Sequence, residues 1–191
     1  MAELKCGVCI CGLNGSGKTT LAEALSKELS FKHMDIEDYY FKPSEKPYSS
    51  SRSREQVEEL ISKDIVTNPC FVFSAVDGNI TDEMNSAYDL VVYLDVPVDI
   101  RMKRIRKRSV DKFGDRVLPS GDMYEQEEEF FEFASKRDPV FIELWLNTLS
   151  CRVLYLDGTS SINENVKRIT SELDLLKSLL LWEKGDRDSG G

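Results

Sequence analysis

The chain has 191 residues, of which 41% are hydrophobic and 9% aromatic, and its formal net charge is −9. This composition excludes global disorder and suits one α/β domain that is large enough to bury a core. The negative charge argues against a nucleic-acid partner, which would need a broad basic surface, so any anion site must be local.

The sequence has no basic-then-apolar leader and no apolar run approaching about 20 residues. We therefore expect a cytoplasmic protein without a membrane partner. The cysteines number five, and three of them, Cys6, Cys9 and Cys11, lie in one expected strand. Reduced, buried thiols are a better prediction for them than disulfides or a zinc site.

The first apolar run, residues 4–11, leads directly into Gly12-Leu13-Asn14-Gly15-Ser16-Gly17-Lys18-Thr19. This is a complete G-x-x-x-x-G-K-[ST] phosphate loop, and the apolar spacing of residues 18–30 predicts the helix that should follow it, with Thr20 in its first turn. Loop N–H groups and the helix dipole bind phosphate, the lysine reaches the β/γ-phosphates, and the threonine hydroxyl binds Mg²⁺. The sequence therefore predicts a strand, a phosphate site and a helix.

A second strand is expected over residues 31–36, and carboxylates gather where it ends, at Asp35, Glu37 and Asp38. The proline- and serine-rich residues 42–53 are typical of a loop. A helix should follow, because Val57, Leu60, Ile61 and Ile65 recur at helical spacing before Asn68-Pro69 stops it.

Three further apolar runs, residues 70–76, 90–94 and 151–156, are typical of buried parallel strands. Each ends at an aspartate, namely Asp77, Asp95 or Asp157. Other segments are expected as a short helix around Met84, a basic helix over 99–108, a mobile loop over 109–122, an acidic helix over 123–136, a helix after Pro139 over 141–149, and a final helix over 163–182.

Five apolar strands that alternate with helices predict βαβ units with right-handed crossovers. The expected fold class is therefore three-layer α/β/α with a five-stranded parallel sheet. In such sheets ligands bind at the carboxyl ends of the strands, where the phosphate loop and the strand-terminal aspartates lie.

Several features in this order resemble the P-loop small-molecule kinases around adenylate kinase and its nucleoside and shikimate kinase relatives. Behind the phosphate loop they are Asp77-Gly78, Asp95-Val96-Pro97, the spacing Arg104-Ile105 to Arg108, and Asp157-Gly158-Thr159. The match covers about residues 4–182. It implies one P-loop kinase domain over 1–183, with an acceptor-binding segment at about 37–65, a lid at about 109–138 and a flexible tail over 184–191.

The resemblance also implies ATP and Mg²⁺ as cofactors and assigns roles to residues. Arg104 would stack on adenine beside Asp157-Gly158-Thr159, and Arg108 would contact the ATP phosphates from the root of the lid. Asp77 would lie near Mg²⁺ with Thr19, and Gly78 near the acceptor. Arg116 and Arg137 would neutralise charge on the transferred phosphoryl group. The other basic residues of 99–108, Arg101 among them, are expected on a solvated face.

The segment after the second strand departs from adenylate kinase. Nucleoside monophosphate kinases phosphorylate an ionised phosphate and need no base, whereas a hydroxyl acceptor benefits from a nearby carboxylate. The acidic segment favours a hydroxyl acceptor, with Asp35 as the expected base and Glu37 and Asp38 as alternatives. Arg52 and Arg54 would suit an anionic group on the same acceptor, since paired arginines bind phosphate or carboxylate.

We therefore expect ATP-dependent phosphorylation of a small hydroxylated metabolite or nucleoside, with Lys18, Asp35, Arg108 and Arg137 as catalytic residues. Within the enzyme class, a nucleoside monophosphate kinase is the main alternative, and a nucleic-acid end kinase shares the fold. From another class, the chain could be a nucleotide-dependent switch or slow ATPase that acts through a partner.

Overall fold

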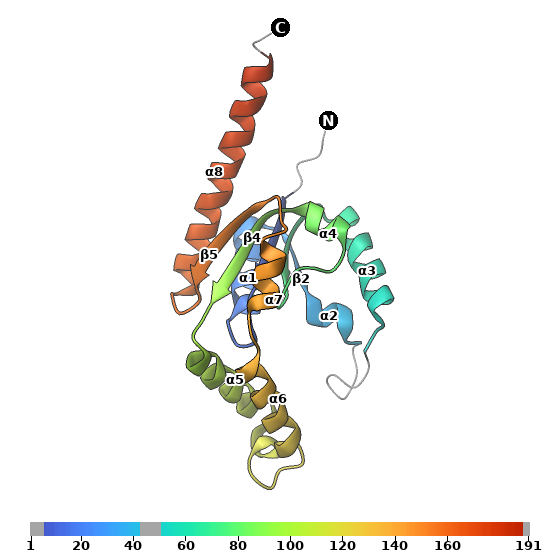
Figure 1. Ribbon diagram of the computed structural model, residues 1–191, viewed down its shortest axis with the longest axis vertical. Helices are drawn as coiled ribbons and strands as arrows, with labels where there is room; N and C mark the ends of the chain where they lie inside the picture. The colour runs from blue at the N-terminus through green and yellow to red at the C-terminus, as the bar shows by residue number, and fades with distance from the viewer. Residues whose placement is uncertain (1–5, 43–50, 189–191) are drawn as a thin grey trace.

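The five predicted strands form one parallel sheet in the order β2-β3-β1-β4-β5. The computed structural model describes residues 6–42 and 51–188, and Figure 1 shows the sheet at its centre. The strands are β1 (Cys6–Cys11), β2 (Lys32–Asp35), β3 (Cys70–Ser74), β4 (Tyr88–Asp95) and β5 (Arg152–Asp157). The five-stranded parallel sheet is thus confirmed.

Helices cover both faces of the sheet. The helices α1 (Lys18–Leu29) and α8 (Ile162–Asp188) pack on one face. Side chains from α2 (Ile36–Tyr40), α3 (Arg54–Thr67), α4 (Asp82–Ala87) and α7 (Val140–Leu146) pack on the other. This arrangement confirms the three-layer α/β/α fold.

The central strand β1 shows how side-chain alternation divides the core. Val8 and Ile10 belong to the cluster with α1 and α8, whereas Cys9 and Cys11 belong to the cluster with α3 and α7. All four side chains are fully buried. Alternate residues of a strand point to opposite faces, so a strand covered on both faces is apolar throughout.

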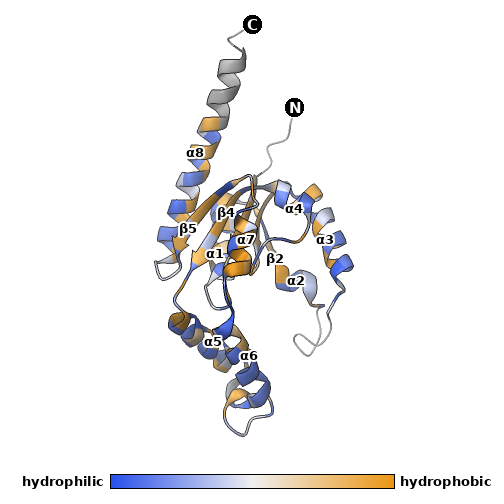
Figure 2. Ribbon diagram, viewed as in Figure 1, coloured by the Kyte–Doolittle hydropathy of each residue, from blue (hydrophilic) through white to orange (hydrophobic). Residues whose placement is uncertain are grey.

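Two helices stand beyond the carboxyl ends of the strands (Figure 1). They are α5 (Val98–Phe113) and α6 (Tyr124–Lys136), joined through the 3₁₀ turn η1 (Gly114–Val117), and we call them the α5–α6 arm. Figure 2 shows the arm as largely hydrophilic, in contrast to α7 on the sheet. Its small core consists of Ile105, Phe131 and Ala134.

The prediction that a loop starts at residue 109 was wrong. Helix α5 continues to Phe113, since no glycine or proline interrupts the pattern before Gly114, whose φ of +60° is outside the helical range. The short helix α2 was not predicted either. It starts because the Asp35 side chain caps it by accepting the Glu37 N–H.

The last helix is longer than the sequence predicts. Helix α8 runs to Asp188, into the segment expected as a tail, and Figure 1 shows its last turns extending beyond the sheet. Residues 1–5, 43–50 and 189–191, which include most of the predicted loop 42–53, lie outside the described residues. No helix in the described part of the chain is long and apolar enough to cross a membrane.

Candidate active site

The phosphate loop connects β1 to α1 with a backbone that only glycine adopts readily. Gly15 and Gly17 have φ values of +81° and +96°. The Ser16 N–H is bonded to the Leu13 carbonyl at 3.1 Å, and no side chain caps the N-terminus of α1. The Ser16 hydroxyl is buried without a hydrogen-bond partner among the described residues. An open helix N-terminus and an unpaired buried hydroxyl fit an anion such as phosphate.

Lys18 lies in the first turn of α1, where charged groups of both signs surround its amine. Burial lowers the pKa of Lys18 to about 8. The carboxylates of Glu37 and Asp35 act in the opposite direction, while the cations Arg108 and Arg137 lower this pKa further. Most of the predicted catalytic residues are therefore close enough to Lys18 to influence its charge.

A cavity of about 450 Å³ opens beside the phosphate loop, and we call it the loop cavity. Its lining is made by Gly15, Ser16, Gly17, Lys18, Thr19, Thr20, Leu21, Leu94, Arg104, Ile105, Arg108, Gly158, Ser160, Ser161, Ile162 and Asn165. The loop cavity thus extends from the phosphate loop, past α5, to the turn between β5 and α8.

Arg104 and Gly158 join the two sides of the loop cavity. The Arg104 guanidinium donates to the Ser16 and Gly158 carbonyls, both at 3.0 Å. A Cβ at Gly158 would come within 2.4 Å of Val96, so this close turn requires glycine. The Asp157 carboxylate accepts the Thr159 N–H and hydroxyl, both at 2.7 Å, and these bonds lower its pKa. Asp157 and Thr159 therefore shape the turn.

Asp35 is the carboxylate beside the phosphate-loop threonine. Its Oδ2 accepts the Thr19 hydroxyl at 2.9 Å and the Ser74 hydroxyl at 2.9 Å, and its Oδ1 accepts the Glu37 N–H at 2.9 Å. The ring of the single histidine, His33, lies 3.3 Å from the Ser74 hydroxyl. Both carboxylate oxygens of Asp35 are therefore held in place.

Asp77, predicted to lie near Mg²⁺, has a different environment. Its Oδ1 accepts the Asn79 N–H at 3.2 Å, and it does not line the loop cavity. Burial lowers the pKa of Arg137, and the Asp77 charge opposes that shift. The Asp77 charge thus acts on Arg137, and the carboxylate that contacts Thr19 is that of Asp35.

A second cavity, of about 380 Å³, lies between the α5–α6 arm and the body of the protein, and we call it the arm cavity. It is lined by Asn14, Glu37, Phe41, Ile105, Arg108, Ser109, Lys112, Phe113, Gln126, Glu127 and Phe130. Arg108 and Ile105 line both cavities. Arg108 is therefore the cationic side chain at the point where the two cavities adjoin.

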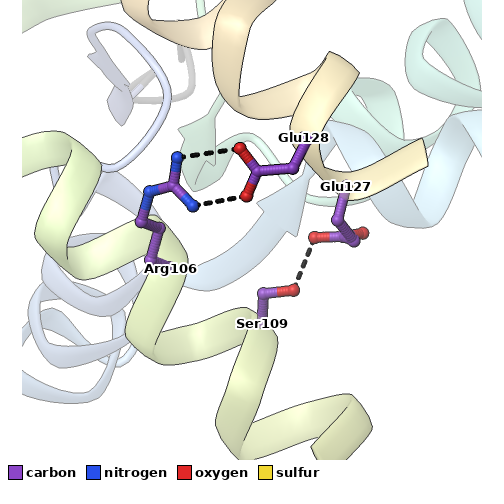
Figure 3. Close-up of polar contacts among 4 residues, drawn as sticks. All are labelled: Arg106, Ser109, Glu127 and Glu128. Atoms are coloured by element: carbon purple, nitrogen blue, oxygen red, sulfur yellow. Dashed lines mark hydrogen bonds and ion pairs between the residues drawn. The ribbon is translucent and has the colours of Figure 1, made fainter. Parts of the chain in front are cut away.

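Polar contacts join α5 to α6 (Figure 3). Arg106 makes a bidentate pair with Glu128, with distances of 2.6 and 3.1 Å. Closer to the cavity, the buried Ser109 hydroxyl donates to Glu127 at 2.5 Å. These contacts hold the two helices together and place the Glu127 carboxylate at the cavity wall.

A family model described as an AAA domain matches residues 8–132. The chain belongs to this family. An uncharacterized protein of Bacillus subtilis, YqaC, is 35% identical over 92% of this chain and 99% of its own length. A cytidylate kinase of Sulfurisphaera tokodaii is 27% identical over 85% of this chain and 91% of its own length.

Solved kinase structures share the fold of this AAA-domain protein. A gluconokinase from Sinorhizobium meliloti superposes with a TM-score of 0.57 at 14% identity, covering 94% of this chain and 97% of that one. A shikimate kinase from Bacteroides thetaiotaomicron gives a TM-score of 0.57 at 17% identity, covering 88% and 98%. Together with the family match, these structures confirm the resemblance to the P-loop small-molecule kinases.

The sequence predicts that Arg101 lies on the solvated face of the basic helix, and this prediction was wrong. Its side chain is buried and donates to the carbonyls of Val96 at 3.2 Å, Asn14 at 3.1 Å and Ala134 at 3.3 Å. Arg101, Ile105 and Ser109 are the buried residues of α5. Their spacing of four residues was the signal that could have revealed a buried stripe on this basic helix.

We expect Arg101→Met to lower the free energy of unfolding by roughly 2–4 kcal/mol, because three carbonyl groups lose their donor in a buried site. Urea denaturation measures this change. Lys103→Met, on an exposed position of the same helix, is the matched control and should change stability by less than about 0.5 kcal/mol. Equal effects of the two substitutions would contradict the structural role of Arg101.

Arg137 approaches the phosphate loop from the end of the α5–α6 arm. Its Nη1 donates to the Asn14 side chain at 3.1 Å, and its guanidinium lies 4.8 Å from the centre of the Phe141 ring. Asn14 thus accepts from Arg137 through its side chain and from Arg101 through its carbonyl. The predicted catalytic residue Arg137 is therefore beside the phosphate loop.

The two arginines predicted to bind an acceptor anion are engaged elsewhere. Arg52 Nη1 donates to the carbonyls of Asp38 at 3.0 Å, Tyr39 at 2.8 Å and Phe41 at 3.2 Å, which closes the C-terminus of α2. Arg54 pairs with Glu58 at 2.7 Å on an exposed face of α3. Neither guanidinium lines the loop cavity or the arm cavity.

Two other predicted residues also have local partners. Gly78 is buried, and a Cβ there would come within 2.8 Å of Cys9, Tyr88 and Trp145, so a side chain at this position would disturb the packing. Arg116 pairs with Asp122 at 2.7 Å near the tip of the α5–α6 arm. In this conformation neither residue lines either cavity.

The lowered pKa of Lys18 predicts a pH dependence of ATP binding. Below pH 8 the Lys18 amine is charged in the free protein, and above it the charge is lost, whereas bound phosphates would restore the charge. The dissociation constant of ATP should therefore be nearly constant up to about pH 7, about double by pH 8 and rise by up to about tenfold per pH unit well above pH 8. Equilibrium binding across this range measures it; a flat profile would contradict the assigned contact.

Proposed function

We propose that this protein is an ATP-dependent kinase that transfers the γ-phosphoryl group to a hydroxyl of a small molecule. The observation that carries the proposal is that Arg108 lines both cavities. A cation at this position faces the donor on one side and the acceptor on the other, which suits the charge that develops during transfer. A nucleotide switch would need no second cavity.

The loop cavity suits the nucleotide. The backbone of the phosphate loop and Lys18 would bind the phosphates, and Arg104 would lie against the base. Thr19 and Asp35 would hold Mg²⁺, since hydroxyl and carboxylate oxygens are the ligands that this ion prefers. The hydrogen bond between these two side chains supports Asp35, in place of Asp77, for this role. Mg²⁺ would supply charge neutralisation on the phosphates.

Glu37 is the best candidate for the general base. It lines the arm cavity, and its charge acts on Lys18 more strongly than that of any other carboxylate. Asp35 already accepts three donors, and Asp38 does not line the cavity. A carboxylate within reach of the acceptor hydroxyl would take its proton as the O–P bond forms.

Three cations would share the negative charge of the transferred group. Lys18 is on the phosphate loop, Arg108 is between the cavities, and Arg137 is held beside the loop by Asn14. Preorganised charges of this kind stabilise the transition state without reorganising during the reaction. With these charges held by the fold, catalysis would depend mainly on positioning the acceptor.

The lining of the arm cavity favours a hydroxylated acceptor. Glu37 and Glu127 would repel a phosphate group and accept hydroxyl or amine donors, and three phenylalanines give apolar contact. The solved neighbours include a gluconokinase and a shikimate kinase. A nucleoside monophosphate kinase is the second candidate, favoured by the cytidylate kinase relative and by Arg108 and Lys112 in the same cavity.

An acceptor panel tests the proposal. Nucleosides, nucleoside monophosphates, sugar acids and shikimate are each incubated with MgATP, and ADP release is measured. We expect turnover with at least one hydroxylated compound that carries no phosphate. Turnover only with monophosphates would support the second candidate instead, and no acceptor-dependent ADP release would contradict the kinase assignment. A cytoplasmic location and the absence of a nucleic-acid partner stay predictions from sequence.

A further inference from the structure

Asn165 lines the loop cavity and carries an unpaired hydrogen-bond acceptor. The residue lies in the first turns of α8, its side chain is 1% exposed, and it lines the cavity. Its Nδ2 donates to the Asp157 carbonyl at 3.0 Å. Its Oδ1 is buried and has no hydrogen-bond partner among the described residues. The amide is therefore fixed in orientation and can offer a ligand only an acceptor.

Unpaired buried polar atoms are concentrated at this cavity. In residues 6–42 and 51–188 such atoms occur on Ser16, Ser26 and Asn165, and two of these three residues line the loop cavity. An unpaired buried acceptor destabilises a protein, and such groups are rare unless a ligand or water satisfies them. Ser16 belongs to the phosphate loop, whereas Asn165 belongs to the side of the cavity formed by α8 and the turn between β5 and α8.

A nucleotide in the loop cavity would place its base on the side away from the phosphate-binding residues. Lys18 and Thr19 supply the phosphate-binding side, whereas Asn165 is on α8, which follows the Gly158 turn in the chain. The Arg104 guanidinium is anchored to that turn and to the phosphate loop, so a planar cation flanks the space between them. A nucleotide with its phosphates on Lys18 would therefore direct its base toward Asn165.

We propose that Asn165 is a specificity-determining residue whose Oδ1 accepts the 6-amino group of adenine. Adenine carries an N–H donor at this position, whereas guanine carries an oxygen acceptor. A guanine oxygen facing Oδ1 would place two acceptors together, and Nδ2 is already committed to Asp157. The proposal rests on the nucleotide half of the proposed function and is independent of the phosphoryl acceptor.

Nucleotide binding to the full chain without acceptor tests the proposal. Dissociation constants with Mg²⁺ are measured for ATP, for GTP and for purine riboside triphosphate, in which hydrogen replaces the 6-amino group. The unmodified protein should bind ATP at least about tenfold more tightly than either analogue, the loss expected for one buried hydrogen bond. In Asn165→Leu this discrimination should fall to within about twofold.

The comparison of two ligands across two proteins cancels any general effect of the substitution on the fold. Asn163→Leu, on an exposed position of the same helix, is the matched control and should keep the discrimination of the unmodified protein. If Asn165→Leu does not fold, Asn165→Ser takes its place, because serine is smaller than asparagine and also lacks the amide. Equal affinities for ATP and purine riboside triphosphate in the unmodified protein would overturn the proposal, as would unchanged discrimination in the Asn165 variants.

These outcomes are separate from a failure of the kinase assignment. Discrimination by Asn165 with no phosphorylated product from any acceptor would leave the base contact standing and remove the kinase function. Product formation with equal use of ATP and GTP in the unmodified protein would leave the kinase function standing and remove the base contact of Asn165.

Discussion

Lys18→Ala should lower kcat/KM for MgATP by about 10³-fold, because the amine that reaches the phosphates is lost together with its share of transition-state stabilisation. Its surroundings support so large an effect, since Glu37, Asp35, Arg108 and Arg137 all act on its charge. ADP release with the best acceptor of the panel measures the loss.

The fold should survive this substitution. Burial lowers the pKa of Lys18, which means that the folded state disfavours the charged amine, so its removal should not decrease the melting temperature. Circular dichroism on heating tests this. Lys27→Ala, on an exposed position of the same helix, should keep turnover within about twofold. Full activity of Lys18→Ala would refute the assignment of the site.

Glu37→Gln should lower kcat by roughly 10²–10³-fold with a hydroxyl acceptor, because the amide cannot take the hydroxyl proton. Its dissociation constant for ATP should change far less than kcat at pH 7, since Glu37 lines the arm cavity and not the loop cavity. Above pH 7 the lost charge should weaken ATP binding, because Glu37 raises the pKa of Lys18. Single-turnover kinetics separate the two quantities. Asp38→Asn, one residue further on an exposed position, is the matched control and should be nearly fully active.

Asp35→Asn distinguishes the two carboxylate roles. If Asp35 holds Mg²⁺, this variant should need a higher Mg²⁺ concentration for half-maximal activity, whereas Glu37→Gln should not. The opposite pattern, with an unchanged Mg²⁺ requirement in Asp35→Asn and near-normal kcat in Glu37→Gln, would assign the base to Asp35 as the sequence suggests.

The sheet and the phosphate loop could be predicted because their signals are local. Continuous apolar runs identify buried parallel strands, and the spacing from Gly12 to Thr19 has one well-understood geometry. The strand order could not be predicted with the same ease. Asp35 pairs in register with Ser74 on the neighbouring strand. Its carboxylate accepts both the Ser74 and the Thr19 hydroxyl, whereas Asp77 bonds the Asn79 N–H.

Arg101 shows a second reason why the sequence alone was not sufficient. Residue type gives the charge of a side chain but not its partner, and Arg101 binds backbone carbonyls, which every residue carries. Asn165 gave no signal at all, because an unpaired Oδ1 is visible only once the surrounding packing is known. Arg108 and Ile105 line both cavities, and this position depends on how α5 packs against the phosphate loop and α6, which the sequence does not show.

The stoichiometry of the reaction tests the central claim most directly. Phosphorus NMR follows MgATP, the unmodified protein and the best hydroxylated acceptor in one tube. Phosphoryl transfer from ATP in the loop cavity to an acceptor in the arm cavity predicts one phosphate ester of the acceptor for each ADP, with no excess of inorganic phosphate. Inorganic phosphate appearing in equal amount to ADP, with the acceptor unchanged, would contradict it and identify the protein as an ATPase.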